Sequence, residues 1–212
     1  MDALNVIRET KVISILRGVG AEQLHGVMDA LYDGGVRCVE IALNSDGALK
    51  MIDKAKKDYG GRMLIGAGTV LDGAGARLAI EAGADFALSP TLSFEFIKMC
   101  LTYNVLAVPG VFMLIEALSA WQAGARLIKV FPAGSVGPSY IKGMKGPLPQ
   151  LELLPVGGVT AENAADYIRA GAAAVGIGSC LVNSRNAGDA DTIRAKAEKL
   201  TSLLKNVPKS RT

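Results

Sequence analysis

The chain has 212 residues, of which 50% are hydrophobic and 5% aromatic, and its formal net charge is +3. This length suits one domain over residues 1–212 that buries about 70% of the surface exposed by the unfolded chain. So small a charge gives no indication of nucleic-acid or membrane binding, although a small anionic ligand remains compatible with it.

The compartment is indicated by the N-terminus, the apolar runs and the cysteines. No basic stretch followed by an apolar core and a cleavage site opens the sequence, and no uncharged apolar run reaches the roughly 18–20 residues of a membrane span. Cys38, Cys100 and Cys180 are odd in number, widely spaced and in apolar company. We expect a soluble cytoplasmic protein with three buried thiols rather than a metal or redox site.

Short β-rich runs alternate with helical patterns from one end of the chain to the other. The expected strands are Val12–Arg17, Cys38–Leu43, Leu64–Thr69, Phe86–Ser89, Leu106–Pro109, Leu127–Phe131, Glu152–Val156 and Ala174–Gly178. The expected helices are Ala21–Asp33, Asp46–Tyr59, Asp72–Ala82, Ser93–Tyr103, Leu114–Ala123, Tyr140–Lys145, Ala161–Ala170 and Asp189–Lys205. This alternation predicts parallel βαβ units, and about eight of them fit a (β/α)8 barrel of the TIM type better than an open sheet.

A repeated glycine supports this reading. Gly35, Gly83, Gly124 and Gly171 each stand between a helical pattern and the next strand. Glycine ends a helix there in the left-handed conformation without steric cost. In such a barrel, chemistry lies at the carboxyl ends of the strands, so the residues at those ends are the candidates for a site.

Lys129 is the most unusual residue at these ends, because it interrupts the apolar run Leu127–Phe131. A lysine is rarely buried without a reason, since removing its charge from water is costly. Burial lowers its pKa, and a neutral amine is a nucleophile towards carbonyl groups. The run taken alone fits equally well an edge strand whose lysine points to water.

Glu40 lies in a similar apolar run, Val39–Leu43, and Arg17 ends the first strand. Burial would raise the pKa of Glu40 towards the range useful for acid–base catalysis. Arg17 could hold a substrate carboxylate through a two-pronged hydrogen bond. The alternative is a buried ion pair of Glu40 with Lys129 or Arg17 that only fills the barrel.

Glycine-rich turns follow the seventh and eighth strands, where barrels of this kind commonly bind phosphate. Gly157 and Gly158 precede Thr160, which we expect to be a helix N-cap, and Ser179 follows the last strand. The glycines could also serve only as tight turns. His25, the only histidine, lies in a helical pattern away from the strand ends, and no spacing resembles a metal site.

A buried lysine, a buried glutamate, an arginine and a phosphate turn, without a metal or dinucleotide fingerprint, indicate Schiff-base carbon chemistry. The amine would condense with a keto group, and the resulting iminium would accept the electrons of an adjacent carbon–carbon bond. Glu40 is the strand-borne carboxylate placed to move the protons that this chemistry requires.

Six motifs occur in a recognisable order: Ile15-Leu16-Arg17-Gly18, Val39-Glu40-Ile41, Gly66-Ala67-Gly68-Thr69-Val70-Leu71, Ser89-Pro90, Val130-Phe131-Pro132-Ala133 and Val156-Gly157-Gly158-Val159. In these motifs the chain resembles the bacterial KDPG/KHG aldolases, which act on 2-keto-3-deoxy-6-phosphogluconate and 4-hydroxy-2-oxoglutarate. The resemblance covers about Val6 to Leu204. It implies a cofactor-free class I aldolase, a homotrimer, that cleaves a keto-acid sugar phosphate to pyruvate and D-glyceraldehyde 3-phosphate, and 4-hydroxy-2-oxoglutarate to pyruvate and glyoxylate.

The resemblance also implies a role for each matching residue. Lys129 would form the Schiff base and Glu40 would be the acid–base group, acting through a water molecule. Arg17 and Thr69 would hold the pyruvate end, while Pro90 and Phe131 would wall the pocket. The phosphate would bind to a further set of residues: Gly157, Gly158 and Ser179.

Two positions depart from the gluconate enzymes. Asn44 stands where they have an arginine, and Val156 where they have a threonine before the glycine pair. Both changes resemble the 2-dehydro-3-deoxy-6-phosphogalactonate aldolases, whose substrate differs at C4. The gluconate activity, which the resemblance as a whole implies, is the first expectation. The galactonate activity is the alternative, and a non-catalytic sugar-phosphate-binding barrel is a remote third.

Overall fold

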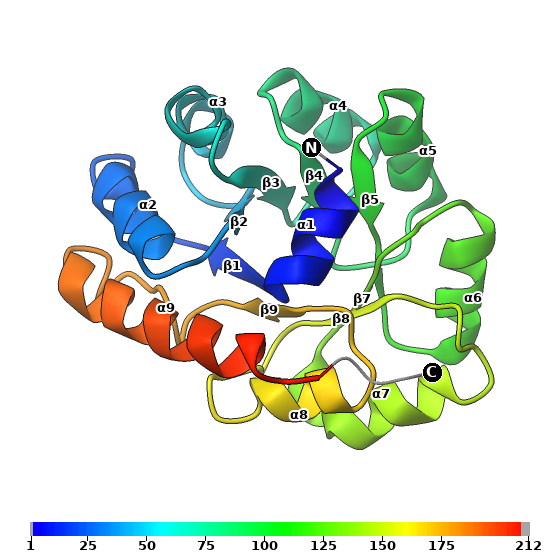
Figure 1. Cartoon of the computed structure of the whole chain (residues 1–212). Helices are drawn as coiled ribbons and strands as arrows, with labels where there is room; N and C mark the ends of the chain where they lie inside the picture. Colours follow the sequence, from blue (N-terminus) through cyan, green and yellow to red (C-terminus); the bar gives the residue numbers. More distant parts are fainter. Residues whose placement is uncertain (1, 209–212) are drawn as a thin grey trace.

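Parallel strands surrounded by helices make up residues 2–208, the part of the chain that the computed structural model describes (Figure 1). The strands are β1 Val12–Leu16, β2 Cys38–Ala42, β3 Leu64–Gly68, β4 Phe86–Leu88, β5 Leu106–Val108, β6 Gly110–Val111, β7 Ile128–Val130, β8 Leu153–Pro155 and β9 Val175–Ile177. The helices are α1 Ala3–Thr10, α2 Leu24–Asp33, α3 Ala48–Tyr59, α4 Gly73–Glu81, α5 Phe94–Thr102, α6 Leu114–Gln122, α7 Gly137–Lys145, α8 Ala164–Arg169 and α9 Ala190–Lys205, with a short 3-10 helix at Ala133–Ser135.

The strands pair in parallel and form a (β/α)8 barrel, which confirms the expected fold class. One sheet has the order β5-β4-β3-β2-β1-β9 and the other the order β6-β7-β8. β5 and β6 follow each other with only Pro109 between them, because proline has no N–H to continue the ladder. A bridge between Val156 and Gly176 joins β8 to β9 and closes the ring.

The expected elements agree closely with this structure. Each predicted strand matches an observed one to within one residue at either end, and each predicted helix matches to within three residues. The four glycines after the helices have φ angles of 87°, 92°, 99° and 104° at Gly35, Gly83, Gly124 and Gly171, which confirms the left-handed helix ends. No helix within residues 2–208 is long and apolar enough to cross a membrane.

The N-cap prediction for Thr160 is wrong. α8 begins later, at Ala164, and its N-cap is Asn163. The Oδ1 atom of Asn163 accepts the backbone amide of Thr160 at 2.8 Å, so the residues between them form a turn instead of the first turn of the helix. Asparagine side chains readily bond nearby backbone amides and so favour a turn over a helix. At Asn163 this preference delays the start of α8 beyond the position that the sequence pattern predicted.

Two apolar clusters pack on the two faces of the strands. On β1, Val12 and Leu16 belong to the cluster under the helices, whereas Ile13 and Ile15 belong to the cluster inside the barrel. Because both faces of each strand are buried, the strands are continuous apolar runs without a polar alternation. Any charged side chain on an inward position is therefore surrounded by this interior.

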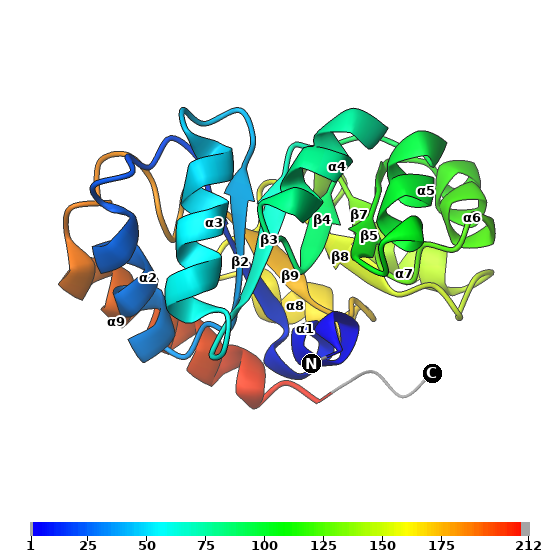
Figure 2. The same cartoon turned by 90° about the horizontal axis from the view of Figure 1, so that it is seen from above.

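Helix α1 is an element that the sequence pattern did not predict. Its residues Leu4 and Ile7 are buried in the inner cluster beside Ile13, Cys38 and Leu127, which lie at or near the starts of their strands. Figures 1 and 2 show α1 covering one end of the barrel. This helix closes the amino end of the strands, which leaves the carboxyl end for a site.

The prediction of three buried thiols holds for two of them. Cys38 and Cys100 are buried, and burial raises the pKa of each thiol to about 12. Cys180 is exposed, so the prediction is wrong there. It lies in the loop after β9, where its Sγ atom is 3.5 Å from the carbonyl oxygen of Val159. Its apolar sequence neighbours Leu181 and Val182 are buried, whereas the cysteine itself turns outward.

Candidate active site

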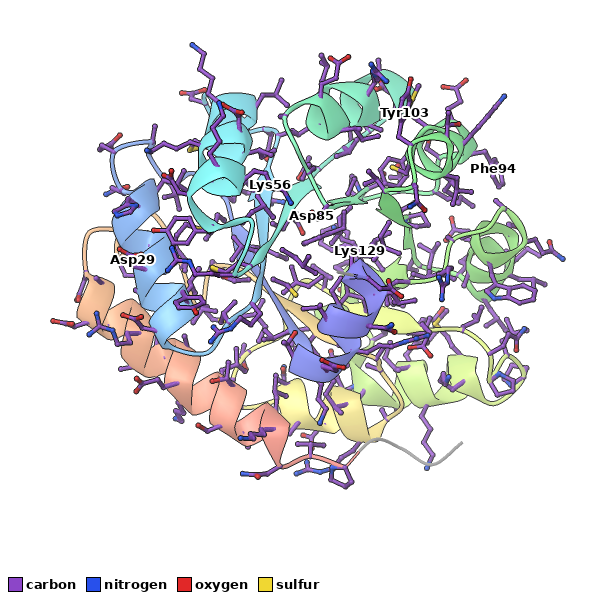
Figure 3. All side chains as sticks on the ribbon, turned by 45° about the horizontal axis from the view of Figure 1, so that its top comes forward. Asp29, Lys56, Asp85, Phe94, Tyr103 and Lys129 are labelled. Atoms are coloured by element: carbon purple, nitrogen blue, oxygen red, sulfur yellow. The ribbon has the colours of Figure 1, made fainter. Side chains whose placement is uncertain are left out.

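Lys129 and Glu40 face each other across the interior of the barrel. Lys129 is on β7 and Glu40 on β2, on opposite sides of the closed ring. Their strand neighbours Ile128, Val130 and Val39 all pack under the helices, so the lysine and the glutamate occupy inward positions. Only 4% of Lys129 and 1% of Glu40 is exposed. Figure 3 shows Lys129 among the strands rather than at the rim.

Burial lowers the pKa of Lys129, which favours the neutral, nucleophilic amine. Desolvation is the main cause; the carboxylate of Glu40 opposes the shift, and the guanidinium of Arg17 adds to it. The Nζ atom lies 4.8 Å from the ring centroid of Phe131, the residue that directly follows β7. The ring partly replaces the water that a lysine would have at a surface.

Burial also raises the pKa of Glu40. Desolvation is again the main cause, and the positive charges of Lys129 and Arg17 oppose it in that order. The Oε2 atom is buried and has no hydrogen-bond partner within residues 2–208. A buried carboxylate that lacks a partner is costly as an anion, so Glu40 is poised to take up or hold a proton.

Gly68 provides the space that Glu40 occupies. A Cβ atom at Gly68 would overlap Oε1, Cδ and Cγ of the glutamate. The same strand also has Gly66 inward, and there the ring of Phe86 fills the space. Glycines on β3 therefore allow two large side chains from β2 and β4 to lie across this strand.

The alternative role of Glu40 as an ion-pair partner is not supported. Among the salt bridges of residues 2–208 there is none between Glu40 and Lys129 or between Glu40 and Arg17. Nη2 of Arg17 instead donates to Oγ1 of Thr69 at 3.4 Å. Thr69 has a φ of 57°, which is unfavourable for a β-branched residue, so its neighbours hold its backbone under strain beside the arginine.

A cavity of about 320 Å³ opens at the carboxyl ends of β1, β7, β8 and β9. Of the predicted site residues, this cavity is lined by Arg17, Phe131, Gly157, Gly158 and Ser179. The structure thus brings the predicted phosphate turns and part of the predicted pyruvate end around one space. The amine of Lys129 lies against the ring of Phe131, and Phe131 lines this cavity.

Thr69 and Pro90 do not line this cavity. Thr69 accepts a hydrogen bond from Arg17, which does line the cavity. Pro90 lies against Gly110, where a Cβ atom would overlap the proline backbone, and Gly110 pairs in register with Lys129. Both residues are therefore near the lysine end of the site rather than the phosphate turns.

Asn183, which was not among the predicted site residues, also lines the cavity. Its side chain donates to the carbonyl oxygen of Ser179 at 2.7 Å. Only its place in the loop after the last strand could have marked it. His25 is exposed on α2 and contacts the hydroxyl of Tyr59, as expected for a helix-surface residue. Within residues 2–208, no group of three or more His, Cys, Asp or Glu side chains could hold a metal ion.

A second cavity, of about 490 Å³, lies at the opposite end of the barrel. It is bounded by the start of α1 and by residues that precede the strands, such as Asp85, Val105 and Arg126. The buried lysine and glutamate do not line it. Lys129 and Glu40 do not line the cavity of about 320 Å³ either, but Arg17 and Phe131 do. Arg17 acts on the pKa of both buried groups and Phe131 lies against the lysine amine, so the cavity at the carboxyl ends is the better candidate for chemistry.

Comparison with known families decides what this barrel is. The sequence model for KDPG and KHG aldolases matches residues 3–196. The chain belongs to the KDPG and KHG aldolase family. It is therefore an aldolase, a carbon–carbon lyase, as the sequence motifs implied.

Relatives in this family carry both substrate names. The chain is 40% identical to the probable 2-dehydro-3-deoxy-6-phosphogalactonate aldolase of Rhizobium meliloti strain 1021, over 85% of this chain and 86% of that protein. It is 34% identical to the 2-dehydro-3-deoxy-phosphogluconate aldolase of Pseudomonas aeruginosa, over 76% of this chain and 73% of that one.

Solved structures of the family share this fold. The structure described as native KDPGal matches with a TM-score of 0.88 and 33% identity, over 92% of this chain and 95% of that chain. The KDPG aldolase of Legionella pneumophila matches with a TM-score of 0.83 and 27% identity, over 96% and 97%. In that crystal, pyruvate was captured as a covalent carbinolamine intermediate.

We expect Lys129→Met to stabilise the fold at neutral pH, because methionine fills the space without a charge to desolvate and the remaining Glu40 can be protonated. Burial lowers the pKa of Lys129 below its ordinary value of 10.5, so the unfolded chain binds this proton more tightly than the folded chain. The cost to the wild-type protein is full at low pH and disappears as the pH rises towards 10.5. The stability gained by Lys129→Met should therefore decrease as the pH rises over the same range.

Urea unfolding of the two proteins across pH measures this gain. Lys142→Met is the matched control, because Lys142 is exposed on α7 and should show a change within about 0.5 kcal/mol. A Lys129→Met protein less stable than the wild type at neutral pH would contradict the desolvation argument.

Proposed function

We propose that this aldolase cleaves a 2-keto-3-deoxy-6-phospho sugar acid to pyruvate and D-glyceraldehyde 3-phosphate through a Schiff base on Lys129. The observation that carries the proposal is the buried Lys129, with a lowered pKa, opposite a buried Glu40 with a raised pKa. Two titratable groups whose pKa values are displaced in this way are typical of acid–base and nucleophilic catalysis.

In the first half of the reaction, the neutral Nζ atom of Lys129 adds to the C2 keto carbon and forms a carbinolamine. Loss of water then gives an iminium ion. Glu40 supplies the proton that leaves with the water, directly or through a solvent molecule in the barrel. The carbinolamine captured in the Legionella enzyme, a relative, supports this sequence of steps.

In the second half, the C3–C4 bond breaks as the C4 hydroxyl loses its proton. The electron pair of that bond moves to the iminium, which becomes an enamine, and the aldehyde departs. Glu40, now ionised, accepts the hydroxyl proton and returns it to C3. Hydrolysis of the resulting imine releases pyruvate and restores the lysine.

The substrate would lie with its carboxylate at Arg17 and Thr69 and its phosphate at the turns after β8 and β9. Arg17 is the only lining residue of the cavity with a permanent positive charge, so the carboxylate end is the strongly electrostatic one. Phe131 and Pro90 would wall the reacting carbons beside Lys129. Gly157, Gly158 and Ser179 would offer backbone N–H groups to the phosphate.

We further propose that the galactonate epimer is the preferred substrate and the gluconate epimer the second candidate. The two epimers differ only in the direction of the C4 hydroxyl. Val156 lines the cavity and offers that hydroxyl no hydrogen bond, and Asn44 supplies no positive charge. The relatives named for galactonate also share more identical residues with this chain than the gluconate relative described above.

A trimer is the assembly we propose for this chain. Large apolar side chains are exposed on three successive helices, α4, α5 and α6, and on the loop before α6: Leu78, Phe94, Leu101, Phe112, Met113, Leu114, Ile115 and Trp121. Figure 3 shows Phe94 and the nearby Tyr103 at the outer rim. So many exposed apolar side chains are unusual on a monomer and favour an interface between copies.

Borohydride reduction with pyruvate tests the chemistry. We expect one reduced adduct, mapped by peptide mass spectrometry to Lys129, because this amine is buried, has a lowered pKa and faces Glu40. Lys129→Ala should lower cleavage by at least about a thousandfold, and Glu40→Gln by about a hundredfold or more. Lys142→Ala is the control and should keep the wild-type rate. An adduct on another lysine, or a Lys129→Ala protein with a near-normal rate, would refute the mechanism.

Cleavage assays with both C4 epimers test the substrate. We expect a higher kcat/KM for the galactonate epimer, and Val156→Thr should shift the ratio towards gluconate by about tenfold, because a hydroxyl replaces a methyl group beside C4. Val159→Thr is the matched control, since Val159 lines the same cavity. Equal shifts in both variants, or a gluconate preference in the wild type, would contradict the assignment.

Light scattering after size exclusion tests the assembly. The wild type should have the mass of three copies, and the double substitution Phe94→Asp with Ile115→Asp should release monomers, because it places charges in an apolar contact. Leu203→Asp, on α9, is the control and should leave the mass unchanged. A wild-type monomer would show that another role must explain the apolar surface.

A further inference from the structure

The two turns at the phosphate end share an unusual hydrogen-bond pattern. In each turn, an asparagine side chain donates to a backbone carbonyl oxygen of a residue that lines the cavity. Nδ2 of Asn163 donates to the oxygen of Gly158 at 3.0 Å, and Nδ2 of Asn183 donates to the oxygen of Ser179 at 2.7 Å. The same kind of side chain thus serves the loop after β8 and the loop after β9.

The neighbouring carbonyl oxygens are also held by donors within the protein. Gly134 N donates to the oxygen of Gly157 at 2.7 Å. Nζ of Lys196 donates to the oxygen of Cys180 at 3.2 Å. The oxygen of Gly178 accepts the amides of the third and fourth residues after it. In both turns, the carbonyl oxygens, whose dipoles would repel an anion, therefore accept hydrogen bonds from donors within the protein.

The backbone amides show the opposite pattern. Those of Gly158, Val159 and Ser179 make no hydrogen bond within residues 2–208. A peptide group is planar with its N–H opposite its C=O. The bond from Asn163 therefore sets the direction of the Val159 amide, and the bond from Asn183 sets that of the Cys180 amide. Both of these residues line the cavity.

Each asparagine is itself held in place. Oδ1 of Asn163 accepts the amide of Thr160 at 2.8 Å. Oδ1 of Asn183 accepts the amides of Arg185 at 2.9 Å and Asn186 at 3.2 Å. Because both ends of the amide group are bonded, the side chain cannot rotate without losing several hydrogen bonds at once.

We propose that Asn163 and Asn183 are positioning residues that turn the peptide groups of Gly158–Val159 and Ser179–Cys180 so that their amides face a bound phosphoryl group. This inference deepens the proposed function and rests on it. It adds the amides of Val159 and Cys180 to those of Gly158 and Ser179. Within residues 2–208, no lysine lines the cavity and Arg17 is its one cation, so oriented amides carry the recognition of the phosphate dianion.

Two substitutions of Asn183 separate this role from its alternatives. Asn183→Leu removes every hydrogen bond of the side chain. Asn183→Asp keeps the acceptor for Arg185 and Asn186 and removes only the donor to Ser179. Asn206→Leu is the matched control, because Asn206 makes the same kind of bond, to Ser202, at the end of α9. Circular dichroism and thermal unfolding establish that each variant is folded.

Binding of inorganic phosphate, measured by phosphorus NMR and as competitive inhibition of cleavage, is the direct readout. In both Asn183 variants we expect the dissociation constant for phosphate and the KM for the phosphorylated substrate to rise by about tenfold, with kcat changed less than about threefold. The pyruvate concentration that half-saturates borohydride trapping at Lys129 should stay within about twofold, because pyruvate does not reach these turns.

Three outcomes would overturn the inference. If only Asn183→Asp weakens phosphate binding, the added charge explains the effect. If the kcat/KM values for phosphorylated and unphosphorylated substrates fall equally, the asparagine is merely structural. If the wild type is trapped by pyruvate but does not bind phosphate, the turns have another role. Absence of trapping in the wild type would instead refute the proposed function, and the NMR measurement would still decide the role of the turns.

Discussion

The cost of removing the Lys129 amine from water is the constraint on which the rest of this structure depends. An inward position in a closed barrel has apolar side chains of the inner cluster around it, and Lys129 is almost fully buried there. Its pKa is lowered by the same burial that makes the position unfavourable for a charge. Reactivity and instability at this position therefore have one physical origin, which the apolar contacts of the whole barrel must offset.

Glycines on the strands make room for bulky neighbours inside the barrel. At the carboxyl half of the barrel, Gly66, Gly68, Gly110 and Gly176 stand on inward or pairing positions, and a Cβ atom at any of them would overlap a neighbour. The space goes to larger side chains or to the backbone of Pro90 instead. Near the amino end, Leu4 of α1 and residues such as Leu127 belong to the inner apolar cluster. The strand glycines therefore decide which neighbouring groups extend into the interior.

The two ends of the substrate cavity use different kinds of electrostatics. Arg17 provides a formal charge that the strained Thr69 contacts. The turns after β8 and β9 provide only backbone groups, whose carbonyl oxygens are bonded to other donors. A fixed charge binds an anion at long range, whereas oriented amides select its shape. This division suits a substrate with a carboxylate at one end and a phosphate at the other.

The sequence by itself determined whatever depends on local patterns. The strand positions and the glycine helix ends follow from runs of neighbouring residues, and the order of the motifs indicated the family. The run around Lys129 left open whether the lysine points inward or to water. Only the tertiary structure decided which distant residues meet. Packing from several strands placed α1 under the barrel, seated Glu40 over Gly68, turned Cys180 outward and brought Asn183 to the cavity. Such outcomes depend on contacts between residues far apart in the chain, which no local pattern contains.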